Sequence, residues 1–197
     1  MTNARTRRTL GGAVAAALVA LGVACGAPQD RTYLTIATAG TGGVYYPLGG
    51  ALAQIYSAEL PGVIASAQST VGSVFNVQAV QQGRADLAFT MGDIAWFAYD
   101  RGTDSDATPH RKLRTLAVLY ENTVQIAVRQ DSDIQTVADL RGRRVGVGAP
   151  GSGTEVSARV IIEAHGLSYG DVTPDYLSFA EVAAQMQDRT LEAGFVT

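Results

Sequence analysis

The strongest constraint on the fold is an alternation of short β-type segments with helical segments. Residues 33–38 alternate polar and apolar side chains, as a strand does, and Pro47 suits the first turn of the helix that follows. Leu48, Leu52 and Ile55 fall on one face of that helix. Further strands are predicted at residues 63–69, 85–90, 113–120, 124–128, 144–148, 176–179 and 191–196, and further helices at 73–82, 94–100, 137–140, 154–165 and 180–188. This order predicts an α/β fold in which helices flank mostly parallel strands.

A joint at Glu121 and Asn122 divides these segments into two groups. Residues 33–120 form a predicted first lobe and residues 121–197 a second one, each with its own strands and helices. A faint internal repeat supports two similar lobes, because a run that starts at Gln82 resembles one that starts at Gln187 and both pass from a helix into a strand. The final residues have strand character without a closing turn or polar tail, so we expect a C-terminally truncated chain.

The N-terminus has the pattern of an export signal. Three arginines precede an apolar run from Ala13 to Ala24, which is shorter than the roughly 20 apolar residues needed to span a bilayer. Cys25, the single cysteine of the chain, follows this run at the place where a bacterial lipobox carries its lipidated cysteine. Residues 1–24 are therefore predicted to be a lipoprotein-type signal peptide, and residues 25–32 a short polar tether.

Two other interpretations of this N-terminus stay open. Gly22 stands three places before Cys25, where a lipobox usually has leucine, so plain secretion with a free Cys25 is an alternative to lipidation. Arg7 and Arg8 also permit export by the twin-arginine route. Each of these interpretations still predicts an exported protein.

The charges and the metal-binding residue types argue against several classes of function. The formal net charge of −3 argues against a nucleic-acid surface. His110 and His165 are the only histidines and lie far apart, and the single cysteine forms no cluster. The sequence therefore predicts no metal site, no bound cofactor and no nucleic-acid partner.

Three glycine-rich turns, each between a strand and a helix, are the candidate binding elements. They occupy residues 39–46, 70–76 and 148–155. The N–H groups at a helix start are unpaired and the helix dipole is positive there, so such turns bind carboxylates and phosphates. In open α/β sheets, ligands also bind beyond the carboxyl ends of the strands. These turns are therefore predicted to line one binding site.

Each turn also has a purely structural explanation. The tyrosines of the first turn can pack as a lid on the core, and Ser73 can cap its helix. Ser152 and Glu155 match the S-x-x-E capping box, in which each side chain accepts from the backbone of the other residue. The helix start nevertheless stays open to an anion through Gly153 and Thr154.

Two motifs of catalysis and nucleotide binding fit this chain poorly. Gly146, Gly148 and Gly151 match the dinucleotide fingerprint G-x-G-x-x-G, but the first two lie within the predicted strand and Pro150 occupies the turn. Ser152, which has glycine on both sides, does not match the G-x-S-x-G elbow of serine hydrolases. We predict binding without catalysis; the alternatives are an exported serine hydrolase that uses Ser152 and a sensor-type binding domain on the same fold.

Four motifs in sequence order carry a family resemblance. They are the run at residues 34–47, Gly-Arg-Ala-Asp-Leu-Ala at 83–88, Pro-Gly-Ser-Gly-Thr at 150–154, and an I-x-x-x-x-D-L-x-G-x-x-V-x-V run at 134–147. The last of these resembles the run that opens the second lobe in type II periplasmic solute-binding proteins. Together the four resemble the TAXI family, the extracytoplasmic solute receptors of tripartite (TRAP) transporters.

The resemblance implies a type II periplasmic-binding-protein-like fold, with two lobes of mostly parallel sheet flanked by helices and a ligand between them. Members of that family continue beyond this length and return to the first lobe, so the first lobe of this chain would be incomplete. By position, the resemblance implies ten ligand-binding residues: Thr41, Gly42, Gly43, Tyr45, Ser73, Asn76, Gly151, Ser152, Gly153 and Thr154.

The implied function is the capture of a small amino acid or carboxylate, such as glutamate, for uptake through TRAP membrane permease subunits. The protein is also expected to be a monomer. Lipidation of Cys25 would anchor it to the cell membrane on its extracytoplasmic face. Hinge closure would bring the helix starts of both lobes onto the charged groups of the solute.

Overall fold

A computed structural model describes residues 31–197 of the chain. The predicted signal peptide at 1–24 and the predicted lipidation site Cys25 lie outside the described residues. Within residues 31–197, no helix is both long enough and apolar enough to cross a membrane.

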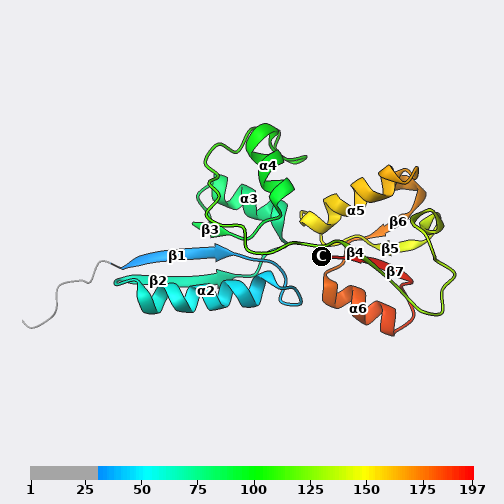
Figure 1. Cartoon of the computed structure of the whole chain (residues 1–197), viewed down its shortest axis with the longest axis horizontal. Coiled ribbons are helices and arrows are strands. Elements are labelled where there is room, and N and C mark those ends of the chain that lie inside the picture. The colour runs from blue at the N-terminus through cyan, green and yellow to red at the C-terminus, as the bar shows by residue number, and fades with distance from the viewer. Residues whose placement is uncertain (1–30) are drawn as a thin grey trace, which may run out of the picture. The chain divides into compact units, whose positions relative to one another are not determined.

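The N-terminal sheet has three strands, with β1 (Thr32–Ala37) in the centre and β2 (Val63–Gln68) and β3 (Leu87–Ala88) beside it. β1 and β3 run parallel, with Ile36 opposite Leu87, and the arrow of β2 points the same way in Figure 1. The helices of this part are α2 (Tyr45–Glu59), α3 (Ser73–Gln81) and α4 (Gly92–Arg101).

Helices cover both faces of this sheet because successive residues of β1 point to opposite sides. The Ile36 side chain is fully buried in a cluster with Ala53 of α2. The next residue, Ala37, is buried in a separate cluster with Ala79 of α3. The alternation that predicts the strand from sequence therefore also decides which helix packs on which face.

The α2 helix packs on the sheet through small residues. Its buried residues are Gly49 and Ala53, whereas Leu48 and Ile55 are 37% and 52% exposed. The predicted apolar face is confirmed for Leu52, which packs partly buried against the cluster of Ile36 and Ala53, and is wrong for Leu48 and Ile55. The reason is steric, because a glycine brings the helix backbone closer to the strands than a leucine can.

Replacing Gly49 with alanine should lower the free energy of unfolding by about 1–3 kcal/mol, as overpacking of a filled core does. A Cβ atom at Gly49 would lie 2.3 Å from Cγ2 of the buried Thr38. Its neighbour Gly50 is the matched control, because a Cβ there meets nothing within 4 Å. Gly50→Ala should be neutral or stabilising by up to about 1 kcal/mol, since alanine is the better helix former. Urea unfolding of both variants checks this; equal effects at the two positions would contradict it.

The C-terminal sheet has four strands in the order β4 (Gln125–Val128), β7 (Ala193–Val196), β5 (Arg144–Gly146) and β6 (Thr173–Asp175). The β5 strand runs parallel to both of its neighbours, and β4 runs antiparallel to β7. The helices are α5 (Gly153–Ala164), α6 (Phe179–Gln187) and two short 3₁₀ turns, η2 (Val137–Leu140) and η3 (Tyr169–Asp171).

The α5 and α6 helices lie on opposite faces of the C-terminal sheet (Figure 1). On the α5 face, Ala158 and Ile162 are buried against Val145 and Phe195. On the α6 face, Val182 packs so closely on glycines of β5 and β7 that a Cβ at Gly194 would lie 2.5 Å from it. Both sheets are thus flanked by helices, and the predicted α/β architecture of mostly parallel strands is confirmed.

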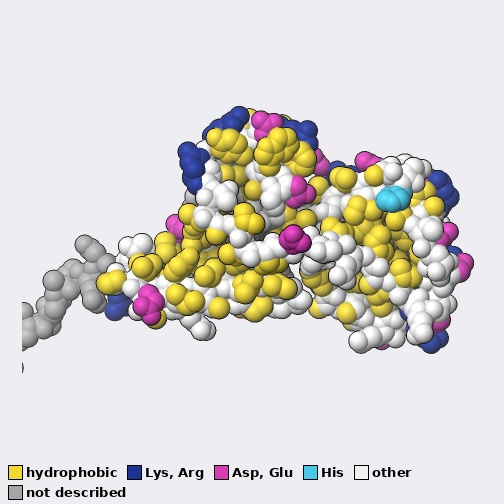
Figure 2. Space-filling view, in the orientation of Figure 1, with side chains coloured by type: hydrophobic (Ala, Val, Ile, Leu, Met, Phe, Trp, Pro, Cys, Tyr) yellow, Lys and Arg dark blue, Asp and Glu magenta, His cyan; other side chains and the backbone are white. Residues whose placement is uncertain are grey.

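Two predicted strands are wrong. Residues 113–120 pair with no strand of the described chain, and Val118 is 91% exposed. Their β-type sequence cannot form a ladder by itself, because a strand needs a partner for its N–H and C=O groups. Leu116, Val118, Leu119 and Tyr120 are instead exposed apolar side chains. Figure 2 shows that apolar side chains also gather on the surface over α2 and the N-terminal sheet.

The strand predicted at 176–179 actually lies at Thr173–Asp175. β6 contains a proline at its middle position, which is tolerated because β6 is the edge strand of its sheet. Residues 176–178 instead lead into α6, with Ser178 as the N-cap.

Candidate functional site

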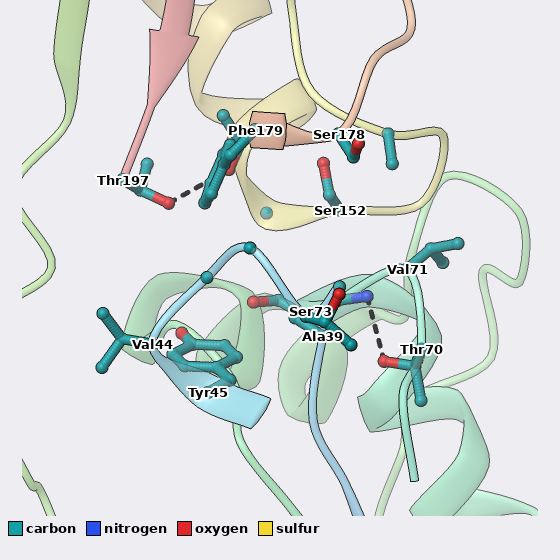
Figure 3. Close-up of a pocket in the computed structure, with 18 of the residues that line it drawn as sticks. Ala39, Val44, Tyr45, Thr70, Val71, Ser73, Ser152, Ser178, Phe179 and Thr197 are labelled. Atoms are coloured by element: carbon teal, nitrogen blue, oxygen red, sulfur yellow. Dashed lines mark hydrogen bonds between the residues drawn. The ribbon is translucent and has the colours of Figure 1, made fainter. Parts of the chain in front are cut away.

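A cavity of about 320 Å³ lies where the connections after several strands meet. Figure 3 shows its two walls facing each other: Ala39, Val44, Tyr45, Thr70, Val71 and Ser73 on one side, and Ser152, Ser178, Phe179 and Thr197 on the other. The first residues of four helices, α2, α3, α5 and α6, all line it. Four positive helix ends therefore converge on one space.

Eight of the ten predicted ligand-binding residues line this cavity: Thr41, Gly42, Gly43, Tyr45, Ser73, Ser152, Gly153 and Thr154. The other two, Asn76 and Gly151, are not part of the lining. That these residues contact a ligand stays a prediction.

Tyr45 contributes a large polar side chain to the N-terminal wall. Its ring packs against Phe89 with 5.3 Å between the ring centroids, and its phenol oxygen accepts a hydrogen bond from Asn122 Nδ2 at 3.1 Å. Burial raises the pKa of the Tyr45 hydroxyl to about 12, although the nearby Ser73 hydroxyl works in the opposite direction. Tyr45 therefore keeps its proton at neutral pH and can donate it.

Ser73, the first residue of α3, does not cap its helix as one explanation of its position predicted. The N-cap residue is Gly72, with φ of 119°, which strongly favours glycine. The Ser73 side chain is 3% exposed, and its oxygen accepts the N–H of Met91 at 3.1 Å. Ser73 thus connects the start of α3 to the loop before α4, and this bond holds its oxygen in place beside the Tyr45 hydroxyl.

Asn76 lies behind this wall and holds the ends of the strands together. It is fully buried, and its amide nitrogen donates to the carbonyl oxygens of Thr38 at 2.6 Å and Phe89 at 2.7 Å. Its amide oxygen accepts from the Thr70 hydroxyl at 2.8 Å. Both ends of the amide are occupied, so in this structure the residue supports the turn and does not reach the cavity.

On the opposite wall, Ser152 is the N-cap of α5. Its oxygen accepts the Glu155 N–H at 3.1 Å. The reciprocal half of the predicted capping box is absent, because the buried Glu155 carboxylate accepts two hydrogen bonds of 3.0 Å from Arg159 and one of 3.2 Å from the Tyr169 hydroxyl. Burial, followed by the Glu155 charge, raises the pKa of Tyr169. This ion pair neutralises the carboxylate in the first turn of α5.

Close contacts join the two glycine-rich helix starts. The N–H of Phe75 in α3 donates to the Gly151 carbonyl at 3.2 Å. A Cβ at Gly153 would lie 2.3 Å from Met91 Sδ and 2.9 Å from Ser73 Oγ. The Gly151 carbonyl therefore links the turn before α5 to α3, and Gly153 permits the close approach of α5 to α3.

The fourth helix start was not predicted as part of the site. Ser178 and Phe179 line the cavity at the start of α6, and Ser178 with Glu181 forms a complete capping box. The S-x-x-E pattern at 178–181 is visible in the sequence, and it was the signal that could have placed this helix start. Thr197 also lines the cavity, with its hydroxyl 3.1 Å from that of Thr154.

The cavity wall offers more hydrogen-bond donors than are used. Within residues 31–197, the first-turn N–H groups of six cavity-lining residues have no acceptor: Tyr45, Ser73, Gly153, Thr154, Phe179 and Ala180. No Asp, Glu, Lys, Arg or His of the described chain lines the cavity. The site can therefore bind a polar or anionic group through dipoles and hydrogen bonds.

The described residues show no catalytic arrangement around Ser152. Neither histidine lines the cavity; the buried His110 contacts the Thr108 carbonyl through Nδ1, and the exposed His165 contacts that of Ile161. No group of three or more His, Cys, Asp or Glu side chains in residues 31–197 is arranged to hold a metal ion.

Solved structures of solute-binding proteins share this fold. The alkanesulfonate-binding protein of Xanthomonas axonopodis pv. citri, bound to MOPS, aligns with a TM-score of 0.56 and 23% identity, over 84% of this chain and 54% of that chain. A substrate-binding protein of an ABC uptake transporter from Streptococcus pneumoniae, with bound histidine, aligns with a TM-score of 0.52 and 16% identity, over 85% and 67%.

A TRAP solute-binding protein from a marine metagenome is similar as well. It is specific for aromatic acid ligands and was solved with 3-hydroxybenzoate; the TM-score is 0.50 and the identity 13%, over 84% of this chain and 57% of that one. This chain therefore spans about half to two thirds of the length of these structures. At these identities the likeness shows the fold, which is that of periplasmic solute-binding proteins.

The family relationship rests on sequence. The NMT1-like family matches residues 36–197, which include every strand and helix described above except the first residues of β1. By this match, the chain belongs to the NMT1-like family.

Proposed function

We propose that this chain is the solute-capturing receptor of an uptake system, and that it holds a small amino acid or carboxylate in the cavity. The observation that carries the proposal is the convergence of four helix starts on one cavity without charged side chains. Such helix starts bind anionic groups, and the wall contains no nucleophile with an adjacent base. The solute-binding proteins among the similar structures support binding rather than catalysis.

The system we propose is of the TRAP type, with the chain as its TAXI-type receptor. The motifs at 34–47 and 150–154 support this choice, since they form two of the turns that line the cavity. The similar structures include receptors of both ABC and TRAP systems, so the choice between them rests on these motifs. The partners would then be TRAP permease subunits in the membrane.

Capture would proceed by closure of two lobes, at 33–120 and 121–197, around the solute. Val156 of α5 packs against the apolar cluster that contains Val77 and Ile94. The polar contacts between the lobes are the Phe75–Gly151 and Tyr45–Asn122 hydrogen bonds and an ion pair of 2.8 Å between Arg159 and Asp104, whose side chain is 79% exposed. An exposed ion pair contributes about 0–1 kcal/mol, so it would permit repeated opening.

A thermal-shift screen of amino acids and carboxylates tests the receptor function. A ligand that binds only the folded chain at 100 times its Kd adds about 2.7 kcal/mol to the free energy of unfolding. We therefore expect a rise of several degrees in Tm for at least one class of solute. A flat response to every solute, in a chain that melts cooperatively, would contradict the proposal.

Anchoring through Cys25 is tested separately. Cys25→Ser should abolish incorporation of labelled lipid and release the protein from the membrane fraction, because the thiol is the site that carries the lipid. Wild-type protein labelled in parallel is the control. Lipid labelling that persists in the variant would refute lipidation at this residue. Wild-type protein that takes up no lipid would instead leave plain secretion with a free Cys25.

A further inference from the structure

We infer that the cavity selects small organic anions that carry no ammonium group, such as simple carboxylates and sulfonates with an apolar body, and discriminates against α-amino acids. The inference rests on the proposed receptor function and narrows its ligand class. It follows from the donors, the charges and the apolar residues of the cavity wall.

Buried hydroxyl groups provide the first argument. Ser73 and Ser152 are 3% and 7% exposed, both line the cavity, and each oxygen already accepts a backbone N–H. Within residues 31–197, the Ser152 hydroxyl donates no hydrogen bond, and the Ser73 hydroxyl has only the Tyr45 hydroxyl beside it. If Ser73 turns toward the nearby Tyr45 oxygen, the Tyr45 hydrogen becomes the free one instead. Buried donors require acceptors, and a ligand in the cavity is the group placed to supply them.

The hydrogen-bond donors of the helix starts point to the same chemistry. Six first-turn N–H groups of the lining residues lack acceptors, as described above. The Thr154 and Thr197 hydroxyls share one hydrogen bond, which leaves one further hydrogen. An oxyanion accepts several hydrogen bonds at once, so it satisfies this surplus, whereas an ammonium group would add three more donors.

The carboxylates near the site do not offset this surplus. Glu155 is paired with Arg159, and Glu181 is occupied by the cap of α6. The charge of Asp93 contributes to raising the pKa of Tyr45, but Asp93 is exposed and is not part of the lining. An α-ammonium group that enters the cavity would therefore lose its hydration without gaining a charged partner.

The remainder of the wall suits an apolar ligand body. Val44, Val71, Met91, Leu177 and Phe179 line the cavity between the polar groups. In Figure 3, Phe179 and Tyr45 come from opposite walls. A ligand whose anionic head meets the helix starts can therefore place a short aliphatic or aromatic body against these side chains.

Calorimetric titration of the full chain with matched ligands tests the inference. The probes are 3-phenylpropionate, phenylalanine and phenethylamine, which share a ring and differ in charge, with propane-1-sulfonate to separate sulfonates from carboxylates. We expect at least one of the two anions to bind, phenylalanine to bind at least about 10-fold more weakly than the better anion, and phenethylamine not to bind.

A charged substitution in the cavity wall tests whether the anion binds inside the cavity. Val71 lines the cavity and is 42% exposed, so the fold should tolerate a polar side chain there. Val71→Asp should weaken anion binding at least about 10-fold more than Val71→Asn, which has the same shape without the charge. Melting curves of both variants verify that they are folded.

The outcomes separate this inference from the proposed function. Phenylalanine bound as tightly as the better anion, or tighter binding of phenethylamine, would overturn the inference while the receptor function stands. Equal effects of the two Val71 variants would place the anion outside the cavity and also overturn it. A folded chain that binds no member of this panel and no solute of the thermal-shift screen would overturn both.

Discussion

Replacing Asn76 with leucine should lower the free energy of unfolding by about 3–5 kcal/mol, the range of a broken buried hydrogen-bond network. The substitution removes three hydrogen bonds, to the Thr38 carbonyl, the Phe89 carbonyl and the Thr70 hydroxyl. The Phe89 carbonyl would then lose its side-chain donor inside the protein. The loss should appear in equilibrium urea unfolding as a lower midpoint with an unchanged slope.

Gln54→Leu is the matched control for Asn76→Leu. It replaces an amide by the same hydrocarbon on the exposed side of α2, where substitutions change stability by about 0.5 kcal/mol or less. If the two variants unfolded at the same urea concentration, Asn76 would not hold the strand ends together. Its predicted role as a ligand contact would then be the remaining explanation.

Replacing Gly153 with valine should weaken binding of the best anion of the titration panel by about 100-fold or more, which corresponds to about 2.7 kcal/mol. Even a Cβ atom at this position would lie 2.3 Å from Met91 Sδ and 3.1 Å from Ser73 Cβ. The Met91 side chain can turn away, but Ser73 belongs to the first turn of α3 and cannot. The start of α5 must therefore move away from α3, and the donors of the two helices no longer reach one ligand.

Two further variants test that explanation. Gly40→Ala is the control, since Gly40 also lines the cavity but a Cβ there meets nothing within 4 Å; it should bind nearly as well as the wild type. Gly153→Ala should bind more weakly, and Met91→Ala should recover part of that loss in the double variant, because the two side chains compete for the same space. Additive effects in this cycle would contradict the steric explanation.

The glycine turns show how far the sequence locates the site. Glycines followed by a helical pattern predict a helix start after a strand. Residues of all three predicted turns line the cavity. The sequence did not show which atoms of a turn face inward. Gly151 was predicted to face the ligand, but its carbonyl is taken by Phe75, 76 positions earlier in the chain.

The start of α6 belongs to the site but was not predicted there, whereas residues 113–120 were predicted as a strand and form none. The Ser178–Glu181 capping box marks a helix start from local sequence, yet its place across the cavity from Tyr45 and Ser73 depends on the packing of the C-terminal sheet. Residues 113–120 have the local sequence of a strand, but no partner strand lies alongside them in the described chain. Local pattern therefore states what a segment can form, and neighbours decide whether it does.

The sequence by itself determined the strand–helix alternation, the α/β class and the positions of the glycine turns, because these depend on side-chain periodicity and on backbone freedom within a few residues. Only the tertiary structure decided that four helix starts meet at one uncharged cavity, that Asn76 supports the wall, and that the Gly151 carbonyl accepts a hydrogen bond from Phe75. Those features depend on contacts between segments that are far apart in the chain or on how a helix face is turned. Local periodicity carries no information about either.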